Sequence, residues 1–460
     1  MSELKKFTDV YNCDSITLNV TDGCNIACRY CFEHDKHPAI MKPQTAIDIV
    51  DAAYNKVSSG VGTFTINIFG GEPLLNWPAI KAVLDHCAEK KYKTKMGITT
   101  NLTLLTDEMI KYFDDYEVML MVSIDGIKKV HDRNRCGTYD TVVKNIHRLI
   151  DAGLALFIEA RLTIMPEDAK YAAEGVKELI EMGINNLCPM AVVDVAWSKE
   201  HLAELKQCYL DMFELYFSYM NDETCKRNIS IKNTNDILVN VMSPEVDDPL
   251  MCPIYSDKWC CFDTNADVYP CHQCPTSTED RKKMTKIGNL YTGIDMSKFA
   301  CKDVHTPYLK EQCKDCIGKA ICKGGCISEN WRMTGDEHIP SDDYCNTRIV
   351  LVEATRKYQH KLLHATNIRN RQLVILKENL KLKDYADTIY HNTNLSDRLT
   401  AVTRITHLKE MIDGMDQFIL PTFRIYLDNI ITTVLTYYLS ASGISIQDAG
   451  KLVKEEKVNG

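Results

Sequence analysis

Short apolar, β-branched runs alternate with longer amphipathic stretches between about residues 15 and 235. Six such runs predict strands: SITLNV, TFTINIF, KMGITT, VMLMVSID, FIEARLTI and NNLCPMAVV. Segments with helical spacing separate them, such as KPQTAIDIVDAAYNKV and TVVKNIHRLIDAG, and the glycine that ends the second is typical of a helix C-terminus. Six strand-helix units in succession predict an α/β fold with a parallel sheet, curled as a partial (β/α)6, TIM-like barrel with its helices outside.

The alternation stops near residue 251, and cysteine and glycine become denser up to Cys345. Eleven of the twenty cysteines lie in this stretch, which predicts a second domain organised by bound ligands. Beyond it, runs such as IVLVEATRKYQHKLL predict a helical segment without chemistry of its own. The expected divisions are an N-terminal segment at 1–14, the barrel at 15–235, a cysteine-rich domain at 236–345 and a helical region at 346–460.

Composition is that of an ordinary globular protein, with 45% hydrophobic and 25% charged residues. The net charge of −9 is uneven, since residues 346–460 carry 16 Lys and Arg against 12 Asp and Glu. A basic excess of this size favours a solvated face over a nucleic-acid surface. The N-terminus lacks an uninterrupted apolar run, and Pro421, Arg424 and Asp428 interrupt the oily stretch near the C-terminus. We therefore expect no secretory signal, no membrane span and no nucleic-acid partner.

Twenty cysteines without an export signal indicate a reducing cytoplasm, where disulfides are rare and metal ligation is the leading explanation for clustered thiols. The unusual residues fall where predicted strands end. CNIACRYC follows the first strand, GGEP the second, TTN ends the third and SIDG the fourth. In parallel α/β folds the chemistry lies at the C-terminal ends of the strands, so we expect these segments to meet there.

Cys24, Cys28 and Cys31 place three thiols on one short loop. Three thiolates can hold three irons of a cubane cluster and leave the fourth iron open to a ligand that is not protein. The alternative is half of a zinc site, which lacks a fourth Cys or a His nearby. Tyr30, just before the third cysteine, could cover the cluster edge or simply pack within the loop.

The C-x3-C-x2-C spacing, the aromatic before its last cysteine and its place after the first strand resemble the radical S-adenosylmethionine (radical SAM) superfamily. In that family the open iron is chelated by the methionine amine and carboxylate of SAM. The GGEP segment resembles the element that binds the SAM amine, and SIDGIKKVHDRNR resembles peptide- and sulfatase-modifying members. The resemblance implies a SAM site that includes Tyr30, Gly70, Gly71, Glu72, Pro73, Asn101, Ser123, Asp125 and Arg161.

Several of these assignments have a structural alternative. The glycines suit close approach of a ligand to the backbone but also a turn. Ser123 and Asp125 suit ribose hydroxyls or the SAM carboxylate. Arg161 could pair with the SAM carboxylate or form a surface salt bridge, and a strand-end Asn101 is often only a turn former.

The run CKDCIGKAICKGGC, with DVYPC and IGNLYTG before it, resembles the SPASM domain, which carries two auxiliary four-iron clusters. By position, the first cluster would use Cys252, Cys260 or Cys261, Cys271 and Cys326. The second would use Cys313, Cys316, Cys322 and Cys345. Ala266 stands where the pattern has glycine, and the adjacent pair leaves the ligand choice open, so the first cluster could keep an open iron for a substrate thiolate. A zinc ribbon is the alternative for this field.

His272 follows Cys271, where sulfatase-maturing members carry an aspartate base. It could take a proton from the substrate. It could equally be a hydrogen-bond donor to cluster sulfur.

The resemblance covers about residues 15–345 and implies three 4Fe-4S clusters, cleavage of SAM to a 5'-deoxyadenosyl radical and an external electron donor of the flavodoxin or ferredoxin type. We expect an oxidoreductase that forms thioether or related crosslinks in a ribosomally made, cysteine-rich peptide. Anaerobic sulfatase maturation is the alternative, and a non-catalytic iron-sulfur or zinc regulator is a third hypothesis.

About fourteen residues precede the first predicted strand, which leaves no room for an N-terminal leader-binding domain. We therefore expect the mildly basic helical region to bind a peptide leader.

Overall fold

The parallel sheet predicted from the sequence is present in the computed structural model, which describes residues 4–33, 36, 38–54, 63–221, 227, 229–232, 234, 257–275, 283–299, 311–322 and 324–364. The six expected strands are confirmed as β2 (Ser15–Asn19), β3 (Phe64–Phe69), β4 (Thr94–Thr100), β5 (Met119–Ser123), β6 (Ile158–Ile164) and β7 (Asn186–Ala191). They pair in parallel in chain order, and β8 (Ser230–Ile231) pairs in parallel with β7.

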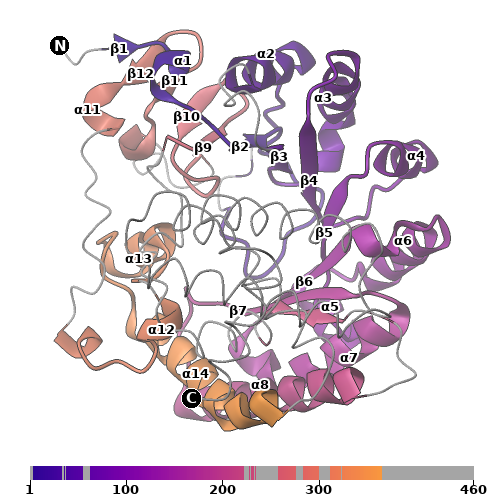
Figure 1. Ribbon diagram of the computed structural model, residues 1–460, viewed down its shortest axis with the longest axis vertical. Helices are drawn as coiled ribbons and strands as arrows, with labels where there is room; N and C mark the ends of the chain where they lie inside the picture. The colour runs from indigo at the N-terminus through magenta and orange to yellow at the C-terminus, as the bar shows by residue number, and fades with distance from the viewer. Residues whose placement is uncertain are drawn as a thin grey trace, which may run out of the picture. The chain divides into compact units, whose positions relative to one another are not determined.

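Helices cover the outer side of this curved sheet (Figure 1). They are α2 (Pro43–Tyr54), α3 (Trp77–Glu89), α4 (Asp107–Asp115), α5 (Lys128–Asn134), α6 (Tyr139–Asp151), α7 (Ala172–Met182) and α8 (Lys199–Asn221), with 3-10 turns η1 (Pro73–Asn76), η2 (Leu154–Phe157) and η3 (Pro166–Tyr171). The predicted stop after α6 is confirmed, because Gly153 has a left-handed φ of 85°.

Burial alternates along the strands, as the pleat requires. On β6, Ile158, Ala160, Leu162 and Ile164 are buried, whereas the residues between them are partly exposed. On β3, the residues Phe64, Ile66 and Ile68 are buried in the same way. The apolar core therefore lies on one face of the sheet. The other face carries partly exposed side chains that a bound ligand could reach.

The sheet continues into the cysteine-rich region, which the sequence did not predict. Strand β9 (Trp259–Phe262) pairs in parallel with β2, and β10 (Asp267–Tyr269), β11 (Gly288–Asn289) and β12 (Gly293–Asp295) follow in antiparallel order. The N-terminal strand β1 (Leu4–Lys5), followed by α1 (Phe7–Val10), pairs with β12. Strand pairing, as well as cysteines, thus organises this part of the chain.

Short elements complete the described chain. They are α11 (Met296–Phe299), η4 (Glu311–Cys313), α12 (Lys319–Cys322), α13 (Ile327–Thr334) and α14 (Asp342–His364). Helix α14 contains the predicted run IVLVEATRKYQHKLL, whereas the later part of the predicted helical region lies outside the described residues. Among the described residues, no helix is long and apolar enough to cross a bilayer.

Candidate active site

The loop after β2 carries the three closely spaced cysteines at the C-terminal ends of the strands. Cys24, Cys28 and Cys31 are partly buried free thiols, and the Cys31 amide donates to the Cys28 carbonyl at 3.2 Å. Burial raises the pKa of Cys28 to about 11, although the neighbouring Arg135 opposes that rise. In the part of the chain that the structure describes, no group of three His, Cys, Asp or Glu side chains is arranged to hold a single metal ion.

Two cations lie beside these thiols. Arg135 Nη1 lies 3.8 Å from Cys28 Sγ, and Lys36 Nζ donates to the Ile26 carbonyl at 3.1 Å within the same loop. Burial lowers the pKa of Lys36, but the nearby Cys31 and the other two thiols raise it overall. A loop with three thiols and two flanking cations has a donor set and a charge that fit an anionic iron-sulfur cluster.

Gly70 and Gly71 bring the segment after β3 against the cysteine loop. A Cβ on Gly71 would lie 2.2 Å from the Gly23 carbonyl oxygen, and one on Gly70 would lie 2.3 Å from the Thr21 oxygen. The Gly71 and Glu72 amides donate to those same carbonyls, at 3.0 and 2.8 Å. Close approach of the two backbone segments therefore requires glycine here, and approach of a ligand to this turn stays a prediction.

The Glu72 side chain is buried and braces the strand ends. It accepts hydrogen bonds from the Leu74 amide at 3.1 Å, the Thr100 hydroxyl at 2.7 Å and the Asn101 amide at 2.7 Å. Burial nevertheless raises its pKa to about 7. Pro73 opens η1, for which Glu72 supplies the cap. Contact between this segment and the SAM amine stays a prediction.

Asn101 and Asn25 join the end of β4 to the cysteine loop. Asn101 Nδ2 donates to Asn25 Oδ1 at 2.9 Å, and Asn25 Nδ2 donates to the Thr103 hydroxyl at 2.7 Å. Asn101 Oδ1 accepts from the Thr103 amide at 3.0 Å, which is the turn-forming role that the sequence left open. Asn101 thus has a clear structural role, and a direct contact with SAM stays a prediction.

Asp125 collects three donors at the end of β5. The Tyr30 hydroxyl donates to Oδ2 at 2.5 Å, Arg135 Nε donates to the same oxygen at 3.1 Å, and the Thr163 amide donates to Oδ1 at 3.1 Å. The Arg135 guanidinium also lies 5.1 Å from the centre of the Tyr30 ring. Tyr30 therefore ties the cysteine loop to β5, and Ser123, the last residue of β5, lies two residues before this carboxylate.

Arg135 is the residue that sequence reasoning did not single out. It lies within HDRNR, just after α5, and only its partners identify its role. Both it and Asp125 are buried, at 6% and 5% exposure, so their ion pair is shielded from water. Burial opposes its charge, but the Asp125 carboxylate raises the pKa of Arg135 overall.

Arg161 extends from β6, where Nη1 lies 3.9 Å from both Met121 Sδ and Cys188 Sγ. Its charge acts on two groups that come from the cysteine-rich region. Burial lowers the pKa of His272, and the Arg161 charge lowers it further. Burial raises the pKa of Glu329, and the Arg161 charge is one of the effects that oppose this rise. A pairing with the SAM carboxylate stays a prediction for this residue.

His272 lies between the loop that carries Cys24, Cys28 and Cys31 and its own neighbour Cys271. Its ring centre is 4.6 Å from that of Phe69, which precedes Gly70, and 6.4 Å from that of Phe32, which follows Cys31. Its Nδ1 is 3.9 Å from Cys271 Sγ. Burial, and after it the charge of Arg161, lowers the pKa of His272 to about 4, so the imidazole is neutral at pH 7 and a weaker base than a free histidine.

The adjacent cysteines of β9 lie in different environments. Cys260 Sγ lies 3.9 Å from Cys13 Sγ, whereas Cys261 Sγ lies 3.5 Å from Asn19 Oδ1. Ala266, where the pattern has glycine, has a left-handed φ of 62°, which explains why glycine is preferred there. The remaining proposed ligand on this side, Cys252, lies outside the described residues.

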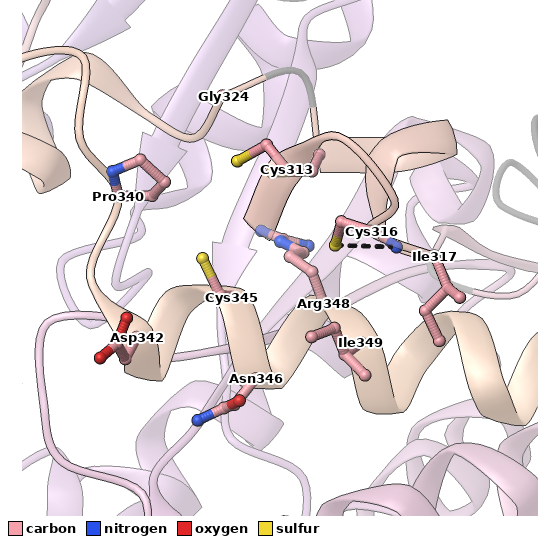
Figure 2. Close-up of a pocket in the computed structure, with 12 residues that line it drawn as sticks. Cys313, Cys316, Ile317, Gly324, Pro340, Asp342, Cys345, Asn346, Arg348 and Ile349 are labelled. Carbon is pink, nitrogen blue, oxygen red and sulfur yellow. Dashed lines mark hydrogen bonds between the residues drawn. The ribbon is translucent and has the colours of Figure 1, made fainter. Parts of the chain in front are cut away.

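Four cysteines line a cavity of about 450 Å³ beside α14, as Figure 2 shows for three of them. The Cys313, Cys316 and Cys345 sulfurs point into it, and Cys322 completes the set. The Gly318 amide donates to Cys316 Sγ at 3.3 Å, and Arg348 lies at the wall. Four thiols around one roomy cavity fit the second auxiliary cluster, whose presence stays a prediction.

A family profile described as the Radical SAM superfamily matches residues 18–179. The matched segment includes the cysteine loop, the GGEP segment and the end of β5. The chain therefore contains a radical SAM domain, and such a domain implies SAM and one 4Fe-4S cluster as cofactors.

Two relatives show which kinds of protein this chain is similar to in sequence. The radical SAM cyclopropyl synthase TigE of Paramaledivibacter caminithermalis is 32% identical over 151 residues, which are 29% of this chain but only 32% of that protein. A cysteine-type anaerobic sulfatase-maturating enzyme of Clostridium novyi is 23% identical over 66% of this chain and 85% of its own length.

Solved structures have the same fold. The structure of native anSMEcpe with bound AdoMet and the Cp18Cys peptide matches with a TM-score of 0.60 and 18% identity, covering 76% of this chain and 98% of that chain. Streptococcus suis SuiB bound to its precursor peptide SuiA matches with a TM-score of 0.54 and 17% identity, covering 74% of this chain and 77% of that one. At these identities the likeness shows the fold alone, and a SPASM-type maturase architecture is consistent with it.

Proposed function

We propose that this protein is a radical SAM peptide maturase that oxidatively crosslinks a ribosomally made, cysteine-rich peptide, most directly through thioethers. The relatives support a peptide substrate, since SuiB is bound to a precursor peptide and anSMEcpe to a peptide. The observation that carries the choice is His272, a neutral imidazole between the cysteine loop and Cys271. Where the sulfatase-maturing pattern has a carboxylate base, this chain has His272, to which we assign the role of an uncharged base.

Bound SAM and its cluster, reduced by an external one-electron donor, would supply a 5'-deoxyadenosyl radical that removes one hydrogen atom from a substrate carbon. The protein's own residues would bind the two cofactors and keep water away from them. Cys24, Cys28 and Cys31 would ligate the cluster, and Gly70 and Gly71 would let the backbone approach SAM. The rings of Phe32 and Phe69 beside His272 keep the reacting region apolar, which favours exclusion of water.

A thioether forms when a substrate carbon loses one hydrogen atom and a substrate thiol loses its proton and, with bond formation, one further electron. The hydrogen atom goes to the deoxyadenosyl group, and His272 Nδ1 or Nε2 would take the proton. An auxiliary cluster of the cysteine-rich region would take the electron. The net loss from the peptide is two hydrogens per crosslink.

Sulfatase maturation is the second candidate, because a relative that matches over 85% of its own length is a cysteine-type anaerobic sulfatase-maturating enzyme. The two functions differ in what happens to the thiol. Crosslinking consumes an alkylatable cysteine and keeps its sulfur, whereas formylglycine formation removes the sulfur from the side chain.

The test is anaerobic coexpression with a short cysteine-rich peptide encoded beside the gene, followed by thiol alkylation and mass measurement. We expect a loss of two hydrogens per modification and correspondingly fewer alkylated cysteines. His272→Gln should still form 5'-deoxyadenosine but give less crosslinked peptide, whereas His86→Gln on α3 should match the parent protein. An unmodified peptide from an enzyme that cleaves SAM would contradict the peptide assignment, and sulfur loss would favour the sulfatase alternative.

A further inference from the structure

Strand β9 separates its two adjacent cysteines onto opposite faces. Cys261 pairs in register with Thr17 of β2, and its thiol lies near Asn19, whose side-chain amide donates to the His272 carbonyl at 3.3 Å. Because neighbouring strand residues point to opposite faces, Cys260 points to the other side. On that side, Cys260 Sγ lies 3.9 Å from Cys13 Sγ. Of the two adjacent cysteines, only Cys261 therefore faces the side on which His272 lies.

The thiols on that inner side gather in one buried cluster. Cys261, Cys271 and Cys274 pack together with Tyr269, and all four side chains are no more than 5% exposed. Ile327, which follows Cys326 at the start of α13, packs against the same cluster. The Cys326 backbone is therefore carried to the same place from a segment more than fifty residues away in the chain.

The turn that joins Cys271 to Cys274 has the geometry of the other C-x2-C turns in this chain. The Cys274 amide donates to the Cys271 carbonyl at 3.0 Å, as the Cys31 amide does to Cys28 and, at 3.5 Å, the Cys316 amide to Cys313. The Gln273 amide approaches Cys271 Sγ at 3.5 Å, and the Gly318 amide approaches Cys316 Sγ at 3.3 Å. Such amide-to-sulfur bonds orient and stabilise thiolates that bind metal.

The four thiols also lie close to one another. The Cys271 thiol is hydrogen-bonded to that of Cys274, and Cys326 lies near enough to act on Cys271 electrostatically. Cys274 acts in the same way on Cys261. Four thiols gathered at one place can bind iron together as thiolates.

We infer that Cys274, in the place that the resemblance gives to Cys252, is a ligand of the first auxiliary iron-sulfur cluster, together with Cys261, Cys271 and Cys326, and that Cys260 is not. This inference rests on the proposed function, which requires an auxiliary cluster. Four thiolates would occupy all four irons, which leaves none open for a substrate thiolate. The cluster then serves as an electron acceptor, and the substrate is held by other groups.

The test compares Cys274→Ser with Cys260→Ser in the full-length, anaerobically reconstituted protein. Cys260 is the matched control because it is equally buried and lies beside Cys261 on the same strand. We expect Cys274→Ser to lose iron, by up to about four irons per chain, or to change one auxiliary signal in the electron paramagnetic resonance spectrum. Cys260→Ser should keep the iron content and spectrum of the parent protein.

Unchanged iron and spectrum in Cys274→Ser, or an equal change in Cys260→Ser, would overturn the ligand assignment while leaving the proposed function standing. A parent protein that holds only the iron of the SAM cluster would overturn both. If Cys274→Ser fails to fold, anomalous scattering from iron in crystals of the parent protein decides the question. Iron at bonding distance from Cys274 Sγ supports the assignment, and a cluster bonded to Cys260 Sγ contradicts it.

Discussion

At the scale of single residues, the Asp125 carboxylate connects three segments of the site. One carboxylate accepts from Tyr30 on the cysteine loop, Arg135 after α5 and the backbone of Thr163 on β6. Each donor comes from a different segment, so the carboxylate fixes three segments at once. We therefore assign Asp125 first a positioning role, which adds to the SAM contact that the resemblance implies.

Replacing Arg135 by methionine should destabilise the protein by about 3–5 kcal/mol, because Asp125 would stay buried without its cation. SAM binding should also weaken, since Tyr30 and the Cys28 loop lose their common anchor. Thermal unfolding and equilibrium binding of SAM measure these two effects. Arg29→Met is the control, because the Arg29–Glu167 ion pair is exposed and contributes about 0–1 kcal/mol. Equal effects of the two substitutions would contradict the role of the buried pair.

His131 gives the site a pH dependence through stability. It is fully buried, accepts from the Asp125 amide at Nδ1 and contacts the Thr138 hydroxyl at Nε2. Burial lowers its pKa from 6.5 to about 4. A histidine with a lowered folded pKa contributes stability above the unfolded value, and that contribution is lost as pH falls from about 6.5 to 4, by about 3 kcal/mol at most.

The difference in unfolding temperature between the parent protein and His131→Gln should therefore shrink as pH falls through this window. Melting curves at pH 7 and pH 4.5 measure it. A difference that stays constant with pH would show that His131 does not titrate as its burial requires.

At the scale of elements, the site depends on two loops that touch through backbone atoms. Gly71→Ala would place a Cβ 2.2 Å from the Gly23 oxygen, and only backbone movement can relieve that contact. We expect SAM affinity to fall at least about tenfold, or about 1.4 kcal/mol. Gly97→Ala on β4 is the control, because its Cβ would meet nothing nearer than 3.3 Å. Unchanged affinity in Gly71→Ala would remove this segment from the SAM site.

The strands could be predicted from the sequence because each β-branched run carries its own local signal. The choice between Cys260 and Cys261 could not, since it depends on the register of β9 against β2, some 240 residues earlier in the chain. For the same reason the pairing of β1 with β12 had no signal. Arg135 was missed because only its contacts with Asp125 and Cys28 distinguish it from a surface arginine.

At the scale of the whole molecule, the predicted role of the helical region in binding a leader needs a carefully placed cut. Helix α14 contributes Cys345 and Arg348 to the cysteine-lined cavity and buries Leu351 and Val352. A truncation directly after Cys345 would therefore damage the cavity itself. Removal of residues 365–460 should weaken binding of the precursor peptide while SAM cleavage continues, as measured by peptide anisotropy and 5'-deoxyadenosine formation. Undiminished binding by a folded truncated protein would contradict the leader role.

The central claim is that the cysteine loop and the strand ends form a working radical SAM site. The most direct measurement is formation of 5'-deoxyadenosine and methionine from SAM by the reduced, anaerobically reconstituted protein, beside a variant with Cys24, Cys28 and Cys31 replaced by alanine. We predict product from the parent protein and none from the variant. A parent protein that binds iron yet leaves SAM intact under reduction, with peptide present, would contradict the claim.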